Sequence, residues 1–332
     1  MQHSRLIANQ ELQPIPDRRN WPIWPWALLG IFALIDGLWL LATPIALDAN
    51  AVGTIFSLMP LVVAALLGAK RFEDNDAIYV VCTGLAFILV AWPTLRLFNH
   101  LSMTTALPWA DATLSQLDSM IRFDWHAYIR WLDGQRWLLS IMNWTYTGLN
   151  GYSIFFFLLL ALFPDRRAAC FEFIALFVVS ASLCMTLGMF FPAQAAMVYY
   201  APDLAGFQHV HDSLGTYHIS SLNMLREAPA PVLELDSLPG LVTFPSFHTA
   251  MGVVLIYACR RSLFLLVPSL GINLSMIAAT PLYGSHYGID ILGGIVAALA
   301  TIAIIRHLER RASDATDWVS QLGFARLKAP AA

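Results

Sequence analysis

The residue types best suited to chemistry in this sequence lie in two short motifs, FPSFHTA at residues 244–250 and GSHYGIDILGG at residues 284–294. His286 and Asp290 are four residues apart, so in a helix that begins near His286 they share one face and the carboxylate lies beside the imidazole. An aspartate at the start of an apolar membrane span is costly to insert, which favours a functional role for it. The spacing therefore predicts a histidine that is oriented by a carboxylate.

The first motif places a second histidine at the start of another apolar run. Pro245 and Ser246 open this run, where the free N–H groups of a helix N-terminus favour an anion, and His248 follows within one turn. A neutral imidazole can attack phosphorus, a carboxylate can hold its other nitrogen, and a second histidine can protonate the leaving oxygen. The Ser246 hydroxyl and the helix start would stabilise the charge on the equatorial oxygens. These residue types predict phosphoryl transfer through a covalent histidine intermediate.

The composition indicates which elements must position these motifs. Of the 332 residues, 58% are hydrophobic and 12% are charged, whereas a soluble domain carries about 25% charged residues. We predict an all-α integral membrane protein, a helical bundle of about eight transmembrane spans. The predicted spans are residues 24–42, 51–69, 77–95, 137–163, 168–190, 247–259, 263–281 and 289–305. The net charge of −3 gives no argument for a nucleic-acid partner.

The basic residues orient this bundle. When alternate sides are counted from the N-terminus, fourteen of the 19 lysines and arginines fall on one side and five on the other. The side rich in basic residues is expected to be cytoplasmic, and it contains both termini. Both motifs then begin at the opposite side, which predicts that they meet at one face of the membrane.

The chain divides into four parts around the motifs. Residues 1–20 are expected to form a cytosolic N-terminal tail, and residues 21–76 contain two additional N-terminal spans. Residues 77–305 form the predicted six-span catalytic core, which includes two long outward-facing segments. Residues 306–332 are expected to form a cytosolic C-terminal tail.

The first outward-facing segment, residues 98–136, has apolar residues at helical spacing opposite charged ones. The apolar set is Leu114, Leu117, Ile121, Trp125, Tyr128 and Leu132, and the charged set is Asp111, Asp118, Arg122 and Asp133. This pattern predicts an amphipathic helix, and we favour a helix packed over the mouth of the bundle to a lipid-recognition device. The second segment, residues 191–240, has no clear period and is expected to cover the site as a lid.

Four residues of the second segment could be drawn as a metal cluster: His209, His211, Asp212 and His218. Their spacing matches no standard ligand pattern, so a solvated loop is the favoured interpretation. Arg226 is the sole arginine or lysine of this segment and is a candidate phosphate contact. We expect neither a metal nor another cofactor.

Two further patterns predict packing. Apolar runs without paired spacing contain all four cysteines, which are expected to be free thiols packed as small hydrophobes: Cys82, Cys170, Cys184 and Cys259. Small residues four apart in the last span predict close contact with a neighbouring helix: Gly293, Gly294, Ala297 and Ala298.

The two motifs in this order resemble the second and third signature motifs of the type 2 phosphatidic acid phosphatase superfamily. They are more similar to its inositol phosphorylceramide synthase branch, which has an aromatic residue after the histidine, an aspartate three residues later, and an aliphatic residue and a glycine beyond. In this sequence those positions are His286, Tyr287, Asp290, Ile291 and Gly294. LPWADATLSQLDSMIRFDWHAYIRWL, residues 107–132, also resembles a stretch of bacterial members of this branch. The resemblance covers about residues 91–305.

The resemblance implies a six-helix core whose site faces the periplasm or lumen, which for a bacterial inner-membrane protein is the periplasm. It implies that His286 is the nucleophile, Asp290 its orienting carboxylate and His248 the general acid. Ser246 would touch the phosphate, and no metal is expected in this family.

The sequence departs from the superfamily at its basic residues. The first motif usually has a lysine and an arginine before a proline, and another arginine lies six residues before the nucleophile. This chain keeps Pro192 without a basic neighbour and has Thr280 at the second position. The synthase branch tolerates the same absence. The negative charge of the phosphate must then be compensated by the helix start, by another outward-facing arginine or by the remaining candidate substrate-binding residues. These residues are Arg226, Tyr199, Tyr200 and Tyr287.

These features favour an enzyme that acts on a membrane lipid phosphoester, with an alcohol or lipid as acceptor. Transfer of a phospho head group, as in inositol phosphorylceramide synthesis, is the first hypothesis. Hydrolysis of a polyprenyl or glycerolipid phosphate is the second, because residue spacing does not report how well the site excludes water. A proton-coupled transporter would need paired interrupted helices in two related halves, which the chain does not show. Metal ligation by the two histidines and the aspartate is a fourth reading.

Overall fold

The structure is a computed structural model that describes residues 23–234 and 239–321. The described residues are mostly helical, and their strands are β1 (Ala46–Leu47) and β2 (Val232–Leu233), which pair in parallel. The predicted N-terminal tail, residues 1–20, lies outside the described residues. The all-α membrane architecture predicted from composition is confirmed.

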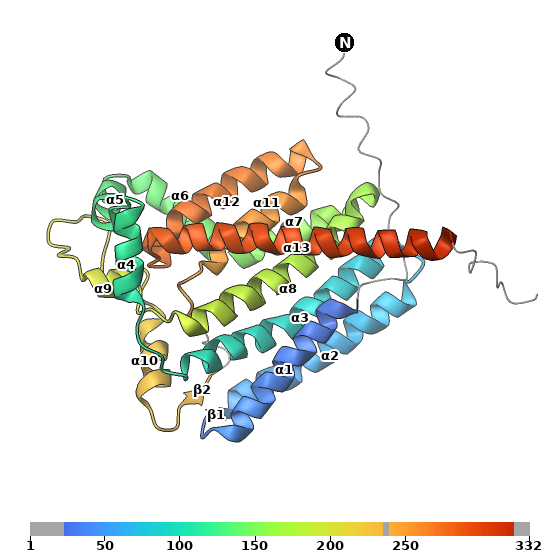
Figure 1. Cartoon of the computed structure of the whole chain (residues 1–332), viewed down its shortest axis with the longest axis horizontal. Coiled ribbons are helices and arrows are strands. Elements are labelled where there is room, and N and C mark those ends of the chain that lie inside the picture. Colours follow the sequence, from blue (N-terminus) through green and yellow to red (C-terminus); the bar gives the residue numbers. More distant parts are fainter. Residues whose placement is uncertain (1–22, 235–238, 322–332) are drawn as a thin grey trace, which may run out of the picture.

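Six helices of the described chain are long and apolar enough to cross a membrane. They are α1 (Trp24–Ala42), α2 (Ala49–Arg71), α3 (Asp76–Met103), α8 (Arg167–Phe190), α12 (Leu263–Tyr283) and α13 (Gly288–Gln321), of which Gly288–Arg311 is the apolar part. Figure 1 shows these helices as a bundle, with the ends of α3 and α8 and the start of α13 on the same side. α13 continues past the predicted end at Ile305, so the predicted C-terminal tail begins as helix.

The two remaining predicted spans differ from simple membrane helices. α6 (Arg136–Thr147) and α7 (Leu149–Leu162) are bent by 65° relative to each other, with Gly148 between them, so at most they form one broken span. α11 (Phe247–Cys259) has 13 residues, which extend about 20 Å, whereas a hydrocarbon core is about 30 Å thick. By length and composition, the described residues contain six candidate spans, or seven if the bent pair forms one span. α11 instead packs against α8, α12 and α13 in the interior of the bundle.

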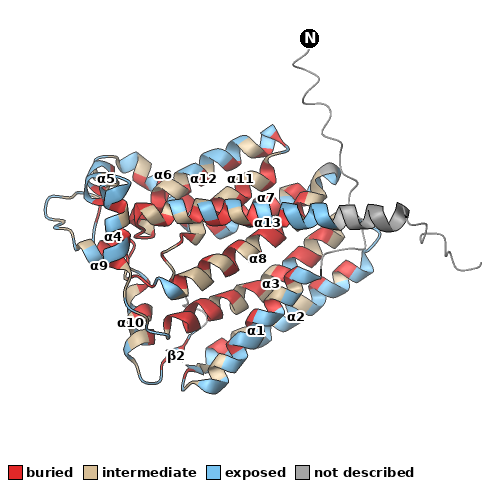
Figure 2. Cartoon of the chain, in the orientation of Figure 1, coloured by how far each residue is buried: buried red, intermediate tan, exposed pale blue. Residues whose placement is uncertain are grey.

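α11 begins where its sequence predicts. Ser246 is the N-cap, and its Oγ accepts a hydrogen bond from the backbone N–H of Thr249 at 3.3 Å. The apolar residues that follow are buried on several sides, because helices surround α11 (Figure 2). Burial of this kind fixes the start of α11 relative to the start of α13.

Close contact between α11 and α13 depends on two glycines of α13, as predicted. A Cβ at Gly294 would overlap the backbone oxygen of Ser246, and a Cβ at Gly293 would lie 2.8 Å from the Phe244 ring. The cysteine prediction also holds, since all four thiols are free and three of them are buried, Cys82 being partly exposed.

The segment 98–136 is not the single amphipathic helix that its periodicity predicts. α3 extends to Met103, and two short helices follow, α4 (Asp111–Met120) and α5 (Trp125–Asp133). Between them Arg122 has a φ of 58°, and the Asp124 carboxylate caps α5 by accepting from Ala127 N at 2.9 Å. Leu114 of α4 and Trp125, Ile129 and Leu132 of α5 belong to one buried apolar cluster, whereas Ile121 in the turn is 40% exposed.

The segment 191–240 contains α9 (Ala196–Tyr200) and α10 (Ile219–Glu227) before it reaches β2. Its backbone is tied to the residues before α13, because Ala196 N donates to the Ser285 carbonyl at 2.8 Å and Met197 N donates to Ser285 Oγ at 2.7 Å. α4, α9 and α10 lie together at the end of the bundle where α13 starts (Figure 1). This segment therefore packs directly over the place where the two motifs meet.

Candidate active site

His286 lies two residues before α13 begins, and not on the helix itself as the spacing predicts. Its Nδ1 is 3.2 Å from Asp290 Oδ2, and that oxygen also accepts the Tyr287 backbone N–H at 3.0 Å. A carboxylate only accepts hydrogen bonds, so Nδ1 donates and the lone pair remains on Nε2. The pair is buried, with 3% of His286 and none of Asp290 exposed. The arrangement is that of an oriented, neutral imidazole.

Ser246 faces the other nitrogen of this imidazole. Its Oγ is 3.3 Å from His286 Nε2, and its backbone N–H donates to the carbonyl oxygen of Asp290 at 3.0 Å. The first bond joins two side chains and the second joins the starts of α11 and α13. The structure thus brings the two sequence motifs together at one end of the bundle.

His248 completes the group of motif residues. Its ring lies edge-on to His286 with 6.4 Å between the ring centroids, and it stacks on Tyr146 of α6 at 4.3 Å with an interplanar angle of 12°. The Tyr146 ring thereby fixes the plane of His248. The two imidazoles are separated by a distance at which a phosphorus atom and its oxygens can contact both.

Two aspartates of α4 hold the start of α13 from outside. Asp118 accepts hydrogen bonds from Gly288 N at 2.9 Å and Ile289 N at 2.7 Å, so it caps α13 although it lies 170 residues away in sequence. Burial raises the pKa of Asp118, and the two backbone N–H groups act in the opposite direction. The periodicity predicts Asp118 on a polar helix face. Only 1% of the residue is exposed, because its carboxylate accepts the N–H groups at the start of α13.

Asp111, at the start of α4, is also buried because its carboxylate accepts hydrogen bonds from other segments. Its carboxylate accepts from the Tyr287 hydroxyl at 2.8 Å and from the backbone N–H groups of Gln194 and Ala195. It therefore joins α4, the segment before α9 and the residue next to His286. Tyr287 is fully buried and its hydroxyl donates to Asp111, so its role as a substrate contact stays a prediction that no described contact supports.

The other predicted substrate-binding residues lie around this core. The Tyr200 hydroxyl donates to Ser115 Oγ at 3.1 Å, and the Tyr199 and Tyr200 rings contact Tyr287 rather than His248 or His286. The Arg226 guanidinium donates to the Leu107 carbonyl at 2.7 Å and lies 3.6 Å from the centroid of the Trp109 ring. These described contacts hold the outer segments together, and none of them joins Arg226 or the two tyrosines to His286.

Three residues near the site were not singled out by sequence reasoning. The Tyr146 and Tyr217 hydroxyls are 3.3 Å apart, and the charge of Arg96, at the outer end of α3, acts on Tyr217. The one available signal was the polar character of the first half of the predicted fourth span, which contains Tyr146. Arg96 and Tyr217 carried no local signal, because their proximity depends on how α3 and α10 pack.

The interpretation of this segment as a solvated loop is wrong for His218. Only 2% of it is exposed, and burial lowers its pKa to about 4, with the neighbouring His286 acting in the same direction. The other candidate ligands lie apart: His209 Nδ1 contacts the Asp133 carbonyl at 2.9 Å, and His211 contacts Ser213. In residues 23–234 and 239–321 no group of three or more His, Cys, Asp or Glu side chains is placed to hold a metal ion.

The comparisons with known proteins agree with the geometry. A family model described as the PAP2 superfamily matches residues 112–304, which is more than half of the chain and includes both motifs, α4 from its second residue on, and the segment over the site. No curated protein and no solved structure matches the chain.

Proposed function

Because the chain belongs to the PAP2 superfamily, whose members are phosphatases or phosphotransferases, we propose that it moves a phospho head group from a donor lipid to an alcohol acceptor. The reaction resembles inositol phosphorylceramide synthesis and proceeds through a phosphohistidine at His286. The observation that carries the proposal is the His286 imidazole, held by Asp290 at Nδ1 and presenting Nε2 beside Ser246.

In the first step His286 Nε2 attacks the phosphorus of the donor phosphodiester. The bond between phosphorus and the lipid alcohol breaks, and His248 gives its proton to the leaving oxygen. In the second step the acceptor hydroxyl gives its proton to His248 and its oxygen attacks phosphorus, which breaks the P–N bond. Asp290 keeps Nδ1 protonated and the ring in position through both steps, and it stabilises the positive imidazole.

The charge on the phosphate needs compensation in the absence of the usual basic residues. The start of α11 supplies backbone N–H groups and the Ser246 hydroxyl. We assign the cationic contribution to Arg96, whose charge acts on Tyr217, and no longer to Arg226, whose guanidinium donates to the Leu107 carbonyl and lies over the Trp109 ring. Arginine suits this role because its planar fork matches phosphate oxygens.

Burial of the site supports transfer over hydrolysis. His286 and Ser246 are almost completely covered, and segment 191–240 packs over them. Exclusion of water favours an alcohol acceptor, since water is the competing nucleophile. Hydrolysis of a polyprenyl or glycerolipid phosphate is the second candidate, supported by the same residues with water as the acceptor.

The test is an assay of the purified protein with labelled lipid phosphoesters, with and without inositol or ceramide. A new labelled phospholipid that depends on His286 supports transfer. Free phosphate or a free phosphorylated head group, formed at the same rate with or without an acceptor, supports hydrolysis. If no labelled lipid is consumed in any of these combinations, both candidates are contradicted.

A further inference from the structure

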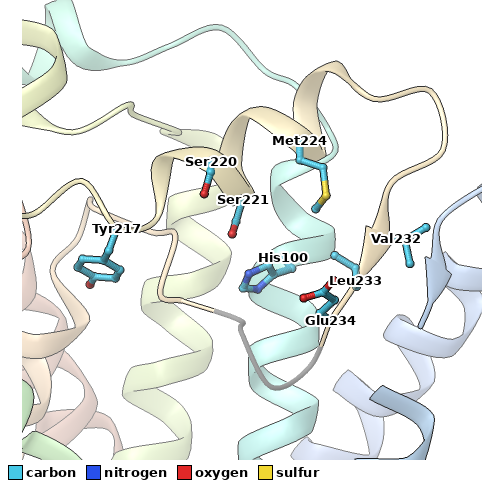
Figure 3. A pocket seen from close by; sticks show the side chains of 8 residues that line it. All are labelled: His100, Tyr217, Ser220, Ser221, Met224, Val232, Leu233 and Glu234. Carbon is cyan, nitrogen blue, oxygen red and sulfur yellow. The ribbon is translucent and has the colours of Figure 1, made fainter. Parts of the chain in front are cut away.

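A cavity of about 400 Å³ lies between the end of α3 and α10, and Figure 3 shows α10 on one side of it and β2 on the other. The histidine and the carboxylate in its lining already have partners. His100 Nδ1 is 3.0 Å from the Arg96 carbonyl, and Glu234 interacts with another part of the chain. The exposed arginines near the site lie elsewhere, around α5 and the start of α6.

The helices α5 and α6 each have one side that the described residues do not cover. α5 buries Trp125, Ile129 and Leu132 against the bundle, whereas Trp131 on the same helix is 55% exposed. α6 begins three residues after α5 ends, and its Trp137 is 65% exposed. We call the exposed side chains of residues 122–137 the α5–α6 corner.

Hydrogen bonds to α12 fix the depth of this corner relative to a membrane span. The hydroxyl of Tyr283, the last residue of α12, donates to the Leu139 carbonyl of α6 at 2.8 Å. The Tyr128 hydroxyl of α5 donates to the Ala278 carbonyl at 2.6 Å, and Ala278 lies about 7.5 Å before the end of α12. Because α12 is a candidate span, its end marks the boundary between hydrocarbon and head groups. The corner therefore lies at this boundary, beside α12 (Figure 1).

The exposed aromatic residues suit this depth. Trp137, Ile141 and Trp144 are exposed and follow each other at helical spacing, so α6 presents an apolar stripe to its surroundings. Tryptophan is enriched at membrane interfaces, where its ring contacts acyl chains and its N–H reaches the head groups. Bilayer lipid is therefore the occupant that fits this side of α5 and α6.

The corner also contains most of the basic residues on this side of the protein. Of the five arginines and lysines that the sequence assigns to the side of the site, three belong to it: Arg122, Arg130 and Arg136. All three are exposed, and none forms an ion pair within residues 23–234 and 239–321. The other two each lie over a tryptophan ring. The three guanidinium groups are thus available to an anion outside the protein.

The acidic residues of this stretch are directed to the backbone. Asp124 caps α5, and Asp133 accepts the N–H groups of residues 208, 209 and 210. The arginine fork matches the oxygens of a phosphate group. A zwitterionic head group carries its own ammonium, which competes with the arginines for that phosphate, whereas an anionic head group does not.

We propose that the α5–α6 corner binds the phosphate group of an anionic phospholipid in the leaflet on the side of the site. Arg130 and Arg136 contact the phosphate, and Trp131 and Trp137 pack on the acyl chains next to it. This lipid is a component of the bilayer and is not consumed, so the proposal is independent of phosphotransfer at His286.

Site-resolved photolabelling tests this proposal. The protein is reconstituted in phosphatidylcholine vesicles that contain a trace of photoreactive phosphatidylglycerol or of photoreactive phosphatidylcholine, and the labelled peptides are identified by mass spectrometry. The anionic probe should label residues 122–144 more strongly than the zwitterionic probe does. Unlabelled phosphatidylglycerol should compete for this labelling, and His286→Ala should be labelled equally well.

A double variant removes the proposed phosphate contacts. Arg130→Gln combined with Arg136→Gln should raise the mole fraction of phosphatidylglycerol that halves the labelling by more than about tenfold, because each basic residue near an anionic surface contributes about fivefold to binding. Its unfolding temperature should not change, since both side chains are exposed. Arg310→Gln combined with Arg311→Gln removes the same charge from exposed positions late in α13 and should leave labelling of the corner unchanged.

Three results would overturn the proposal. The first is equal labelling of the corner by the two probes, and the second is unchanged competition in the variant of Arg130 and Arg136. The third is loss of labelling in His286→Ala, because the label would then report lipid held at the candidate active site. Selective labelling of the corner without lipid turnover in any assay would retain this surface and remove the proposed function.

Discussion

At the scale of single residues, His286 is positioned by neighbours on both of its nitrogens. Asp290 contacts Nδ1 and Ser246 contacts Nε2, while the backbone N–H of His286 donates to the Thr280 carbonyl at 3.2 Å. These contacts leave the ring little freedom. A small displacement of the imidazole should therefore have a large effect on rate.

Removal of the proposed nucleophile or of its proposed orienting carboxylate should affect turnover far more than folding. We expect His286→Ala to abolish transfer, and Asp290→Asn to lower kcat by about 10⁴-fold, the loss known for a triad carboxylate that orients a histidine. Both are measured as initial rates with labelled lipid, and the unfolding temperature serves as the folding control. Wild-type rates in both variants would exclude His286 as nucleophile.

Gly284 provides a test that adds only one methyl group. A Cβ at this position would lie 2.6 Å from both the Tyr146 hydroxyl and the His286 ring, so Gly284→Ala must displace one of them. We expect kcat to fall about a hundredfold, which is typical of a small misplacement of a catalytic group. Gly271→Ala is the matched control, because a Cβ in that part of α12 meets no atom within 4 Å. Equal rates for the two alanine variants would contradict this geometry.

At the scale of elements, α4 acts as an external cap for α13. Its two buried aspartates bind the N–H groups of Gly288 and Ile289 and the hydroxyl of Tyr287, so one short helix holds the end that carries Asp290. α4 therefore contributes to the geometry of the candidate site, and its described hydrogen bonds do not involve His248 or His286.

Asp118→Ala should destabilise this junction. Loss of the cap leaves two N–H groups of α13 without their acceptor, which costs about 1 to 2 kcal/mol. We expect a lower unfolding temperature in detergent together with a lower kcat. Ser119→Ala changes the next residue, which is exposed, and should alter neither quantity. An unchanged unfolding temperature in Asp118→Ala would contradict a capping role.

Because His218, at the start of α10, is buried, the stability of the protein should depend on pH. The pKa of His218 is about 4 in the folded protein and near its ordinary value of 6.5 when unfolded, so between these values the unfolded chain binds a proton that the folded chain excludes. The free energy of unfolding should therefore fall as the pH is lowered from about 6.5 to about 4. Thermal unfolding across this range should show a smaller fall in His218→Gln.

His211→Gln is the control for this effect, because His211 is exposed in the same segment. It should keep the pH dependence of the unchanged protein. The same pH dependence in His218→Gln and in His211→Gln would show that burial of His218 does not contribute.

At the scale of the whole molecule, the elements that carry the candidate site form one part of the bundle and α1 and α2 form another. α1 and α2 pack against α3 and lie outside the residues matched by the family model (Figure 1). α3 therefore connects the added helices to the site, since its outer end carries Arg96 and His100. This arrangement leaves α2 with most of its surface exposed to its surroundings.

The proposed orientation can be tested with single cysteines in cells. Glu73→Cys lies between α2 and α3, and Asp203→Cys lies in the segment over the site; both positions are exposed. With the termini in the cytoplasm, a membrane-impermeant thiol reagent should label residue 203 in intact cells and residue 73 after permeabilisation. The reverse pattern would place the site on the cytoplasmic side.

The sequence by itself determined the membrane class, most of the helices and the two motifs, because apolar length, caps and residue spacing are local properties. It predicted the packing of Gly293 and Gly294 for the same reason. It did not separate α4 from α5, because periodicity can continue across a turn. It predicted eight spans, whereas six of the described helices are long and apolar enough to cross a membrane; α11, which is apolar but has 13 residues, is not among them.

Only the tertiary structure decided what Asp111, Asp118 and His218 do. Each is a polar residue whose local pattern favours exposure, and each is buried because it meets a partner or a site far away in the chain. The same holds for Arg226, which meets Leu107 and Trp109. Hydrogen bonds between segments more than 100 residues apart depend on how the segments pack. The residue pattern within either segment does not predict them.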